Sequence, residues 1–132
     1  MKEIDKIAWI FLKDRKILST LSKGKDTYYI PGGKREGTET DQETLYREIK
    51  EELSVNIKKD TIKYLGTFHA QAHGQKEGIV VKMTCYQSEF EGNIKPSSEI
   101  KEVVWFNHKD KDKSSPVDKI IFDWLKENDL ID

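Results

Sequence analysis

Hydrophobic and polar positions along the chain follow two spacings, one typical of strands and one typical of helices. An apolar, β-favouring run at 6–12 predicts a buried strand, and the polar Asp14-Arg15 turn predicts a hairpin with residues 16–21. Further strands are expected at 27–30, 62–72, 79–90 and 103–106. The predicted order is strand, strand, strand, helix, followed by the same order again. This order predicts an α/β fold in which a mixed β-sheet is sandwiched between α-helices, an α/β/α arrangement.

The first predicted helix has a clear start signal. Thr40 and Glu43 have the spacing of a capping box, so the helix is expected to begin at Asp41. Its apolar residues recur at every fourth position and predict the face that packs against the core. These residues are Leu45, Ile49 and Leu53.

The second predicted helix lies at the end of the chain. Pro116 suits the first helical position, with Ser115 before it as the N-cap. Apolar residues at helical spacing again predict a buried face. They are Val117, Ile120, Ile121, Trp124 and Leu125.

Composition narrows the class of protein. A length of 132 residues indicates a single domain spanning 1–132, and the 36% hydrophobic and 36% charged residues are typical of a soluble globular protein. A net charge of -1 argues against nucleic acid as a partner, and no apolar run is long enough to cross a membrane. The single cysteine, Cys85, lies in an apolar strand pattern, which favours a buried packing role and a cytoplasmic location. A monomer and a homodimer remain open.

The strongest chemical signal is a glycine-rich turn that runs into an acidic helix at 30–55. Glu48, Glu51 and Glu52 are spaced i, i+3 and i+4, so they share one face of the predicted helix. Three like charges on one face repel one another unless a cation neutralises them. Because carboxylates are preferred ligands of Mg²⁺ and Mn²⁺, this face is predicted to bind one of these ions.

The same stretch resembles the Nudix box, the signature of hydrolases that act on nucleoside diphosphates linked to another group. The box is a glycine, five residues, a glutamate, seven residues, and then Arg-Glu-aliphatic-any-Glu-Glu-any-Gly-aliphatic. One position departs from it: Ser54 stands where the family has a glycine that caps the helix in a left-handed conformation, without a catalytic role. The matching positions are Gly33, Glu39, Arg47, Glu48, Ile49, Glu51, Glu52 and Val55.

The resemblance implies roles for the residues of the box. Glu51 and Glu52 are expected to bind the metal, and Glu48 is expected to act either as a further ligand or as the general base. Family members differ on which carboxylate is the base, so this choice stays open. Arg47 is expected to hold Glu39 and the catalytic glutamates in place.

Two further metal ligands are expected outside the acidic helix. The backbone carbonyl of Gly32 matches a ligand of the family. The loop before the strand at 103–106 often supplies one more carboxylate in Nudix proteins, and Glu99 is favoured over Glu102 for this role. The alternative is that this loop is merely acidic and solvated.

Several residues are candidates for binding the substrate. Lys34 follows the glycines at a position that contacts phosphate in the family, and Lys23 and Lys25 are expected either to meet phosphates or to lie in a solvated turn. Ser115 and Asp118 fall in the region that contacts the base in MutT-like relatives. The asparagine expected there in bacterial enzymes for oxidised guanine is missing.

The function implied is the hydrolysis of a small-molecule nucleotide. A nucleoside triphosphate, normal or oxidised, is expected to yield a monophosphate and pyrophosphate, with ADP-ribose or a nucleotide sugar as the alternative. A non-catalytic nucleotide sensor is disfavoured because every carboxylate of the box is present. Three aromatic residues are candidates for stacking on a base, each with core packing as the alternative: Tyr28, Tyr29 and Phe68.

Overall fold

The structure is a computed structural model that describes residues 2–132. Over these residues, none of the helices is long and apolar enough to cross a membrane. The strands are β1 (Lys2–Trp9), β2 (Leu12–Lys13), β3 (Lys16–Ser22), β4 (Tyr28–Tyr29), β5 (Gly32–Lys34), β6 (Asn56–Ile57), β7 (Lys63–Gln71), β8 (Ile79–Gln87), β9 (Phe90–Glu91) and β10 (Ile100–Phe106). The α-helices are α1 (Asp41–Leu53) and α2 (Pro116–Glu127), and the 3-10 helices are η1 (Lys59–Thr61) and η2 (His108–Lys113).

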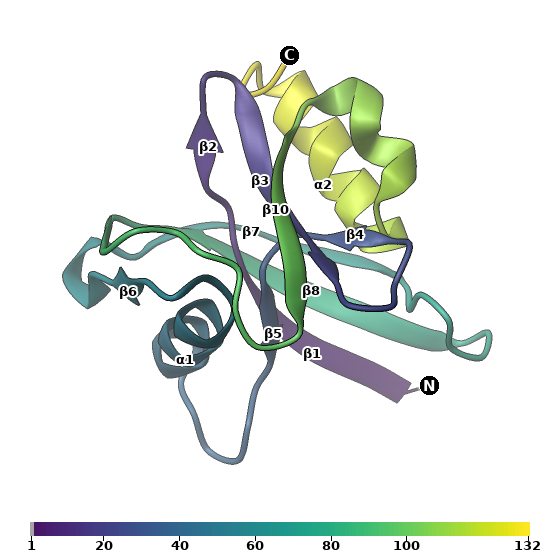
Figure 1. Ribbon diagram of the computed structural model, residues 1–132. Coiled ribbons are helices and arrows are strands. Elements are labelled where there is room, and N and C mark those ends of the chain that lie inside the picture. Colours follow the sequence, from purple (N-terminus) through teal and green to yellow (C-terminus); the bar gives the residue numbers. More distant parts are fainter. Residues whose placement is uncertain (1) are drawn as a thin grey trace.

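The strands lie between the two α-helices, with α1 on one side and α2 on the other (Figure 1). One sheet has the order β5-β1-β8-β7, and β1 and β8 in it are parallel while the other pairs are antiparallel. A second sheet has the order β10-β3-β2, with β4 paired to β3. The predicted α/β/α architecture with mixed strands is therefore confirmed, although the strands divide between two main sheets.

The division between the sheets occurs inside the predicted strand at 6–12. Its first part belongs to β1, which extends back to Lys2 and pairs with β8 up to Trp9. After Ile10 the chain changes partner, and Leu12 pairs with Ile17 in the second sheet. The apolar run is continuous because Phe11 and Leu12, although only partly buried, also pack against the core clusters, and this hides the change of sheet in the sequence.

The side chains of β1 point alternately to the two faces of the sheet, and this explains why one helix packs on each face. Ile7 and Trp9 pack in one cluster with Leu45, Ile49 and Leu53 of α1. Ala8 and Ile10 point to the opposite face, because successive side chains of a strand alternate. There they join the second cluster, which contains Val117, Ile121, Phe122 and Leu125 of α2.

The start and end of α1 are fixed locally. The capping box is present, with the Glu43 amide donating to Thr40 Oγ1 at 3.1 Å and the Thr40 amide donating to Glu43 Oε1 at 2.9 Å. At the other end Ser54 adopts φ 64° and ψ 23°, the left-handed conformation expected of the family glycine. The predicted start at Asp41 and the predicted role of position 54 are both confirmed.

Three details differ from the sequence prediction. Ile120 is 42% exposed, because the buried arc of α2 runs through Ile121, Phe122 and Leu125 and turns Ile120 outward. The sequence predicts no helix or strand between the strand at 103–106 and the helix from Pro116, and η2 forms there. The glycine-rich turn also contributes a strand, β5, since Gly32 lies so close to β1 that an added Cβ would be 2.1 Å from the Ile7 carbonyl oxygen.

Candidate functional site

The Glu48 carboxylate lies directly against the backbone of Gly33. A Cβ on Gly33 would be 2.4 Å from Glu48 Cδ and 2.6 Å from each carboxylate oxygen. Burial raises the pKa of Glu48, and the hydrogen bond from Arg47 opposes this rise. The absence of a side chain at position 33 therefore provides the space in which this carboxylate sits.

Glu52, one turn further along α1, is the most buried carboxylate of the box, at 8% exposure. Its Oε1 accepts a hydrogen bond of 2.9 Å from the Gly32 amide. Burial raises the pKa of Glu52 to about 8, with the nearby charges of Glu48 and Glu99 acting in the same direction. With a pKa of about 8, this carboxyl group is largely protonated near neutral pH. A bound cation would strongly stabilise its charged form.

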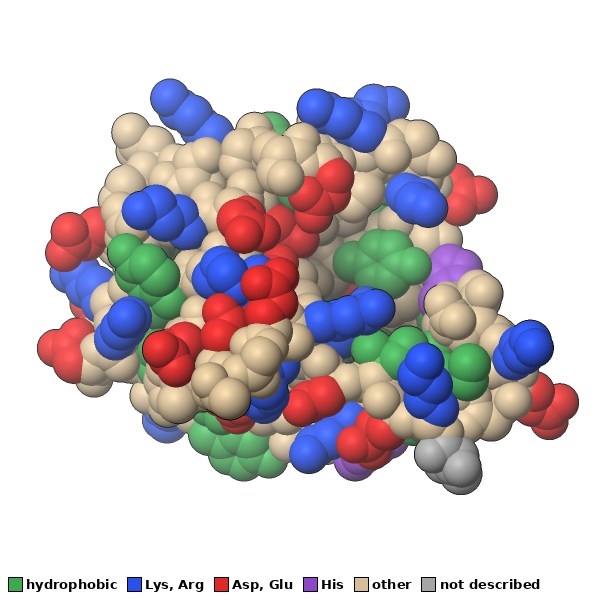
Figure 2. All heavy atoms as spheres, turned by 90° about the horizontal axis from the view of Figure 1, so that it is seen from below, with side chains coloured by type: hydrophobic (Ala, Val, Ile, Leu, Met, Phe, Trp, Pro, Cys, Tyr) green, Lys and Arg blue, Asp and Glu red, His purple; other side chains and the backbone are tan. Residues whose placement is uncertain are grey.

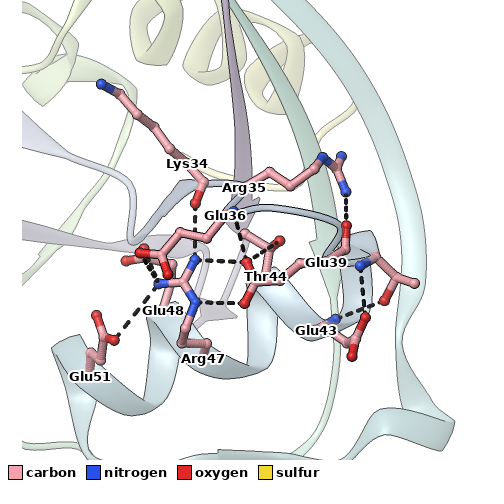
Figure 3. Close-up of polar contacts among 10 residues, drawn as sticks. Lys34, Arg35, Glu36, Glu39, Glu43, Thr44, Arg47, Glu48 and Glu51 are labelled. Carbon is pink, nitrogen blue, oxygen red and sulfur yellow. Dashed lines mark hydrogen bonds and ion pairs between the residues drawn. The ribbon is translucent and has the colours of Figure 1, made fainter.

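Arg47 connects the turn and the helix (Figure 3). Its guanidinium donates to both oxygens of Glu39, at 2.7 and 2.9 Å, and to Glu48 Oε1 at 2.7 Å. It also donates to the Lys34 carbonyl at 3.0 Å and lies 3.7 Å from Glu51 Oε1. The hydrogen bonds from Arg47 lower the pKa of Glu39 to about 2. Arg47 thus makes the contacts expected of a residue that positions Glu39 and the glutamates.

The loop that carries Glu99 is fastened to the end of α1. The Ser97 amide donates to the Glu52 carbonyl at 3.0 Å, and its hydroxyl donates to the Glu51 carbonyl. This loop brings Glu99 near enough to Glu48 and Glu52 for its charge to raise both of their pKa values. The competing candidate, Glu102, accepts a hydrogen bond of 2.6 Å from the Tyr28 hydroxyl on β4.

This set of oxygen donors fits a hard divalent cation such as Mg²⁺ or Mn²⁺. Two observations support the fit. Gly33 leaves the space that the Glu48 carboxylate occupies, and the carboxylate of Glu52 is buried. Within residues 2–132, no three acidic, histidine or cysteine side chains already surround one point at ligand distance. Since Arg47 engages Glu48 and the Gly32 amide engages Glu52, these side chains would have to adjust their oxygens to bind an ion together.

A hollow next to the acidic side chains is lined by lysine and aromatic residues. Figure 2 shows acidic side chains gathered beside a hollowed part of this face, with basic and hydrophobic side chains across from them. One cavity is lined by Gly32, Gly33, Glu52, Lys6 and Tyr29 among others. A neighbouring cavity reaches the start of α2 and includes Lys34, Ser115, Lys6, Tyr29, His73 and Met83 in its lining.

Asp118 lies at the start of α2, directly after Ser115, Pro116 and Val117, which line this second cavity. Its side chain is fully buried, and its Oδ2 accepts a hydrogen bond of 2.8 Å from the Ile30 amide. Burial raises the pKa of Asp118 to about 7. Asp118 Oδ1 and Ser115 Oγ are buried without a hydrogen-bond partner among the described residues. The Ser115 hydroxyl nevertheless lies near enough to the Asp118 carboxyl group to lower its pKa, so these two side chains also interact with each other.

The other candidates are placed as follows. The side chains of Lys23 and Lys25 are on the exposed loop after β3, and the Lys23 amide donates to the Glu99 carbonyl at 2.8 Å. Of the three aromatic candidates, Tyr28 packs on Phe106 and Phe68 packs on Trp124, so both serve the core. Only Tyr29 lines the cavities.

Lys6 is the residue of this region that sequence reasoning missed. It lies on the same face of β1 as Ala8 and Ile10, which are buried, and it lines both cavities. Burial lowers its pKa, an effect that the charge of Asp118 opposes. A lysine in phase with buried apolar residues of a strand was the available signal, because charged side chains on such a face are rarely there for packing.

Comparison with known proteins finds a matching family model and many similar structures. The family model described as NUDIX domain matches residues 5–125. A MutT protein from Methanosarcina mazei has a similar structure, with a TM-score of 0.75, 15% identity, and coverage of 97% of this chain and 96% of that chain. The E. coli ORF135 protein gives 0.73, with 23% identity and coverage of 96% and 92%.

A structure titled UDP-X diphosphatase is also similar, with a TM-score of 0.68, 16% identity, and coverage of 97% of this chain and 64% of that chain. No curated protein sequence matches the chain significantly. At these identities the structural neighbours show a shared fold, whereas the family model extends over most of the chain.

Proposed function

The chain belongs to the Nudix family of hydrolases, and we propose that it cleaves a nucleoside triphosphate, normal or oxidised, to a monophosphate and pyrophosphate. The observation that carries this proposal is the contact of two glutamates with the glycine backbone. Glu48 lies against Gly33 and accepts a hydrogen bond from Arg47, and Glu52 accepts one from the Gly32 amide. Glu52 and the Gly32-Gly33 backbone line one cavity, and a neighbouring cavity that shares lining residues with it reaches the start of α2.

The metal site of the proposal consists of Glu48, Glu51, Glu52, Glu99 and the Gly32 carbonyl. Nudix hydrolases generally use divalent cations, and we propose Mg²⁺ or Mn²⁺ here because every donor is an oxygen. A bound ion would neutralise the negative charge that develops on the phosphate oxygens during cleavage. Arg47 acts as a positioning residue, since it donates to Glu48 directly.

A general base is needed to take a proton from the attacking water. Glu48 and Glu52 are both candidates, because burial raises the pKa of each and so makes each a better proton acceptor once it is ionised. Because the charges of Glu48 and Glu52 interact, the two side chains titrate together, and neither pKa belongs to one residue alone. We therefore assign the base to this pair of residues.

The remaining candidates recognise the substrate. Lys34 lines the cavity and is proposed to bind phosphate, while Lys23 and Lys25 are proposed to meet phosphate from the exposed loop. Ser115 and Asp118 are proposed to read the base, since Ser115 lines the cavity and Asp118 follows it in the first turn of α2. A small nucleotide is the only partner that the proposal requires.

A substrate panel tests the proposal. The protein is incubated with Mg²⁺ and a mixture of normal and oxidised nucleoside triphosphates, ADP-ribose and nucleotide sugars, and the products are identified by mass. The proposal expects a triphosphate to be the best substrate, with a monophosphate and pyrophosphate as products. A much higher catalytic efficiency with ADP-ribose or a nucleotide sugar would overturn it in favour of that alternative.

A further inference from the structure

The two cavities beside the acidic helix share three lining residues, Lys6, Tyr29 and Met83. One cavity contains Gly32, Gly33 and Glu52, which belong to the proposed metal site. The other reaches Ser115, at the proposed base-reading end. The shared residues therefore stand where a substrate would pass from its nucleoside part to its phosphates.

Lys6 is the only charged residue of the three. Its ammonium lies 5.6 Å from the centre of the Tyr29 ring, and its neighbour across the strand pair is Lys34. Over residues 2–132, Lys6 Nζ makes no hydrogen bond or salt bridge, although the carboxylates of Asp118, Glu52 and Glu48 are near enough to affect its pKa. Apart from the Tyr29 ring, this ammonium has no direct partner among the described residues, so its N–H donors are available to a ligand in the cavities.

An anionic group of the substrate would satisfy this ammonium. A lysine ammonium is a compact charge with three donors, which suits a phosphate oxygen. The phosphate between the two ends of the substrate is the one attached to the nucleoside. The phosphates further along the chain lie on the side of Glu52, where the proposed metal site would hold them.

We propose that Lys6 binds the substrate phosphate attached to the nucleoside, and that it links the base-reading end of the cavity to the metal site. This inference rests on the proposed function, because it assumes that a nucleotide spans both cavities. It adds a substrate-binding residue on β1 to the lysines of the loop and turn.

Binding without hydrolysis isolates this contact. The affinities of AMP, CMP, GMP and UMP are measured by calorimetry in EDTA, together with those of the four corresponding nucleosides. The wild-type protein is expected to bind at least one monophosphate more tightly than its nucleoside. Lys6→Met keeps the length of the side chain and removes its charge. It should therefore weaken the binding of that monophosphate by about tenfold or more and leave the affinity for the nucleoside unchanged.

Two further variants complete the test. Lys2→Met is the matched control, since Lys2 is an exposed lysine on the same strand and the same face. It should leave both affinities unchanged. Lys6→Arg retains a cation, so it should keep the preference for the monophosphate and also reports on the contact if Lys6→Met does not fold.

The inference is overturned if Lys6→Met keeps the wild-type ratio between monophosphate and nucleoside. It is also overturned if the wild type shows no such preference, or if Lys6→Arg loses the preference while remaining folded. The failure of the proposed function looks different. In that case no triphosphate is hydrolysed with Mg²⁺, whatever Lys6 does to binding in EDTA.

Discussion

The carboxylate of Glu48 occupies the space that a side chain on Gly33 would need. An added Cβ would be 2.4 Å from Glu48 Cδ, well inside van der Waals contact. Gly33 is not among the glycines with a positive φ, so its backbone conformation suits other residues too. The requirement for glycine at this position comes from the neighbouring carboxylate alone.

Gly33→Ala is therefore expected to displace Glu48 without much effect on the fold. Glu48 Cδ is near the end of a flexible side chain, which can rotate away from a new methyl group. Turnover of the best triphosphate should fall by orders of magnitude, while the free energy of unfolding changes by no more than about 1 kcal/mol. Steady-state kinetics and urea unfolding measure the two effects.

Gly37→Ala is the matched control for this substitution. Gly37 has φ +53° and no atom within 4 Å of an added Cβ, so alanine there strains the backbone and touches nothing. Its cost should be about 1 kcal/mol of stability with turnover unchanged. A Gly33→Ala protein as active as the wild type would contradict the placement of Glu48.

Removing one charge from the carboxylate pair should stop catalysis. Glu52→Gln and Glu48→Gln keep the shape of each side chain but weaken metal binding and remove a candidate base. Both are expected to lower turnover by orders of magnitude at saturating Mg²⁺, as measured by pyrophosphate release. Glu52 is buried, and with a pKa of about 8 its side chain is largely uncharged near neutral pH, so Glu52→Gln should leave the fold intact.

Glu43→Gln controls for the loss of a glutamate from the same helix. Glu43 belongs to the capping box, and glutamine also fits this position of a capping box. Turnover should stay at the wild-type level. Equal, modest losses in all three variants would mean that the site lies elsewhere.

Asp118 should make the stability of the protein depend on pH. Its pKa is raised from 3.8 to about 7 by burial, so between these values the folded state holds a proton that the unfolded state has lost. Stability therefore falls as the pH rises through this range and levels off above it. Asp118→Asn cannot ionise, and its amide oxygen can still accept the hydrogen bond from Ile30.

The difference in unfolding free energy between Asp118→Asn and the wild type should grow in favour of the variant from pH 4 to pH 8. Urea unfolding at several pH values measures it, and a gain on the order of a few kcal/mol is expected. Asp112→Asn, at an exposed position, should show no such trend. A difference that stays constant with pH would show that Asp118 remains ionised in the folded protein throughout.

Sequence reasoning predicted the layers and the start of α1 because these depend on local spacing. The capping box, the turn at Asp14-Arg15 and the glutamate spacing on α1 are all properties of a few neighbouring residues. The change of sheet after Ile10 could not be predicted, since it depends on which distant strand each half meets. Lys6 was missed for a similar reason: its importance comes from two cavities formed by segments far apart in the chain.

Ser54 is the one position at which the chain departs from the box, and it should carry measurable strain. Its φ of 64° disfavours a side chain, although its hydroxyl donates to Ser97 Oγ at 3.2 Å. Since that hydrogen bond is exposed, it offsets little. Ser54→Gly should raise the free energy of unfolding by about 0.5–1 kcal/mol without changing turnover. A loss of stability on this substitution would show that the hydrogen bond outweighs the strain.

The proposed hydrolysis requires a divalent metal ion. Hydrolysis of the best triphosphate is measured after treatment with EDTA and again after Mg²⁺ or Mn²⁺ is added back, for the wild type and for Glu52→Gln. The carboxylate face predicts no hydrolysis in EDTA, full recovery in the wild type with either ion, and little recovery in the variant. Undiminished hydrolysis in EDTA would contradict the claim.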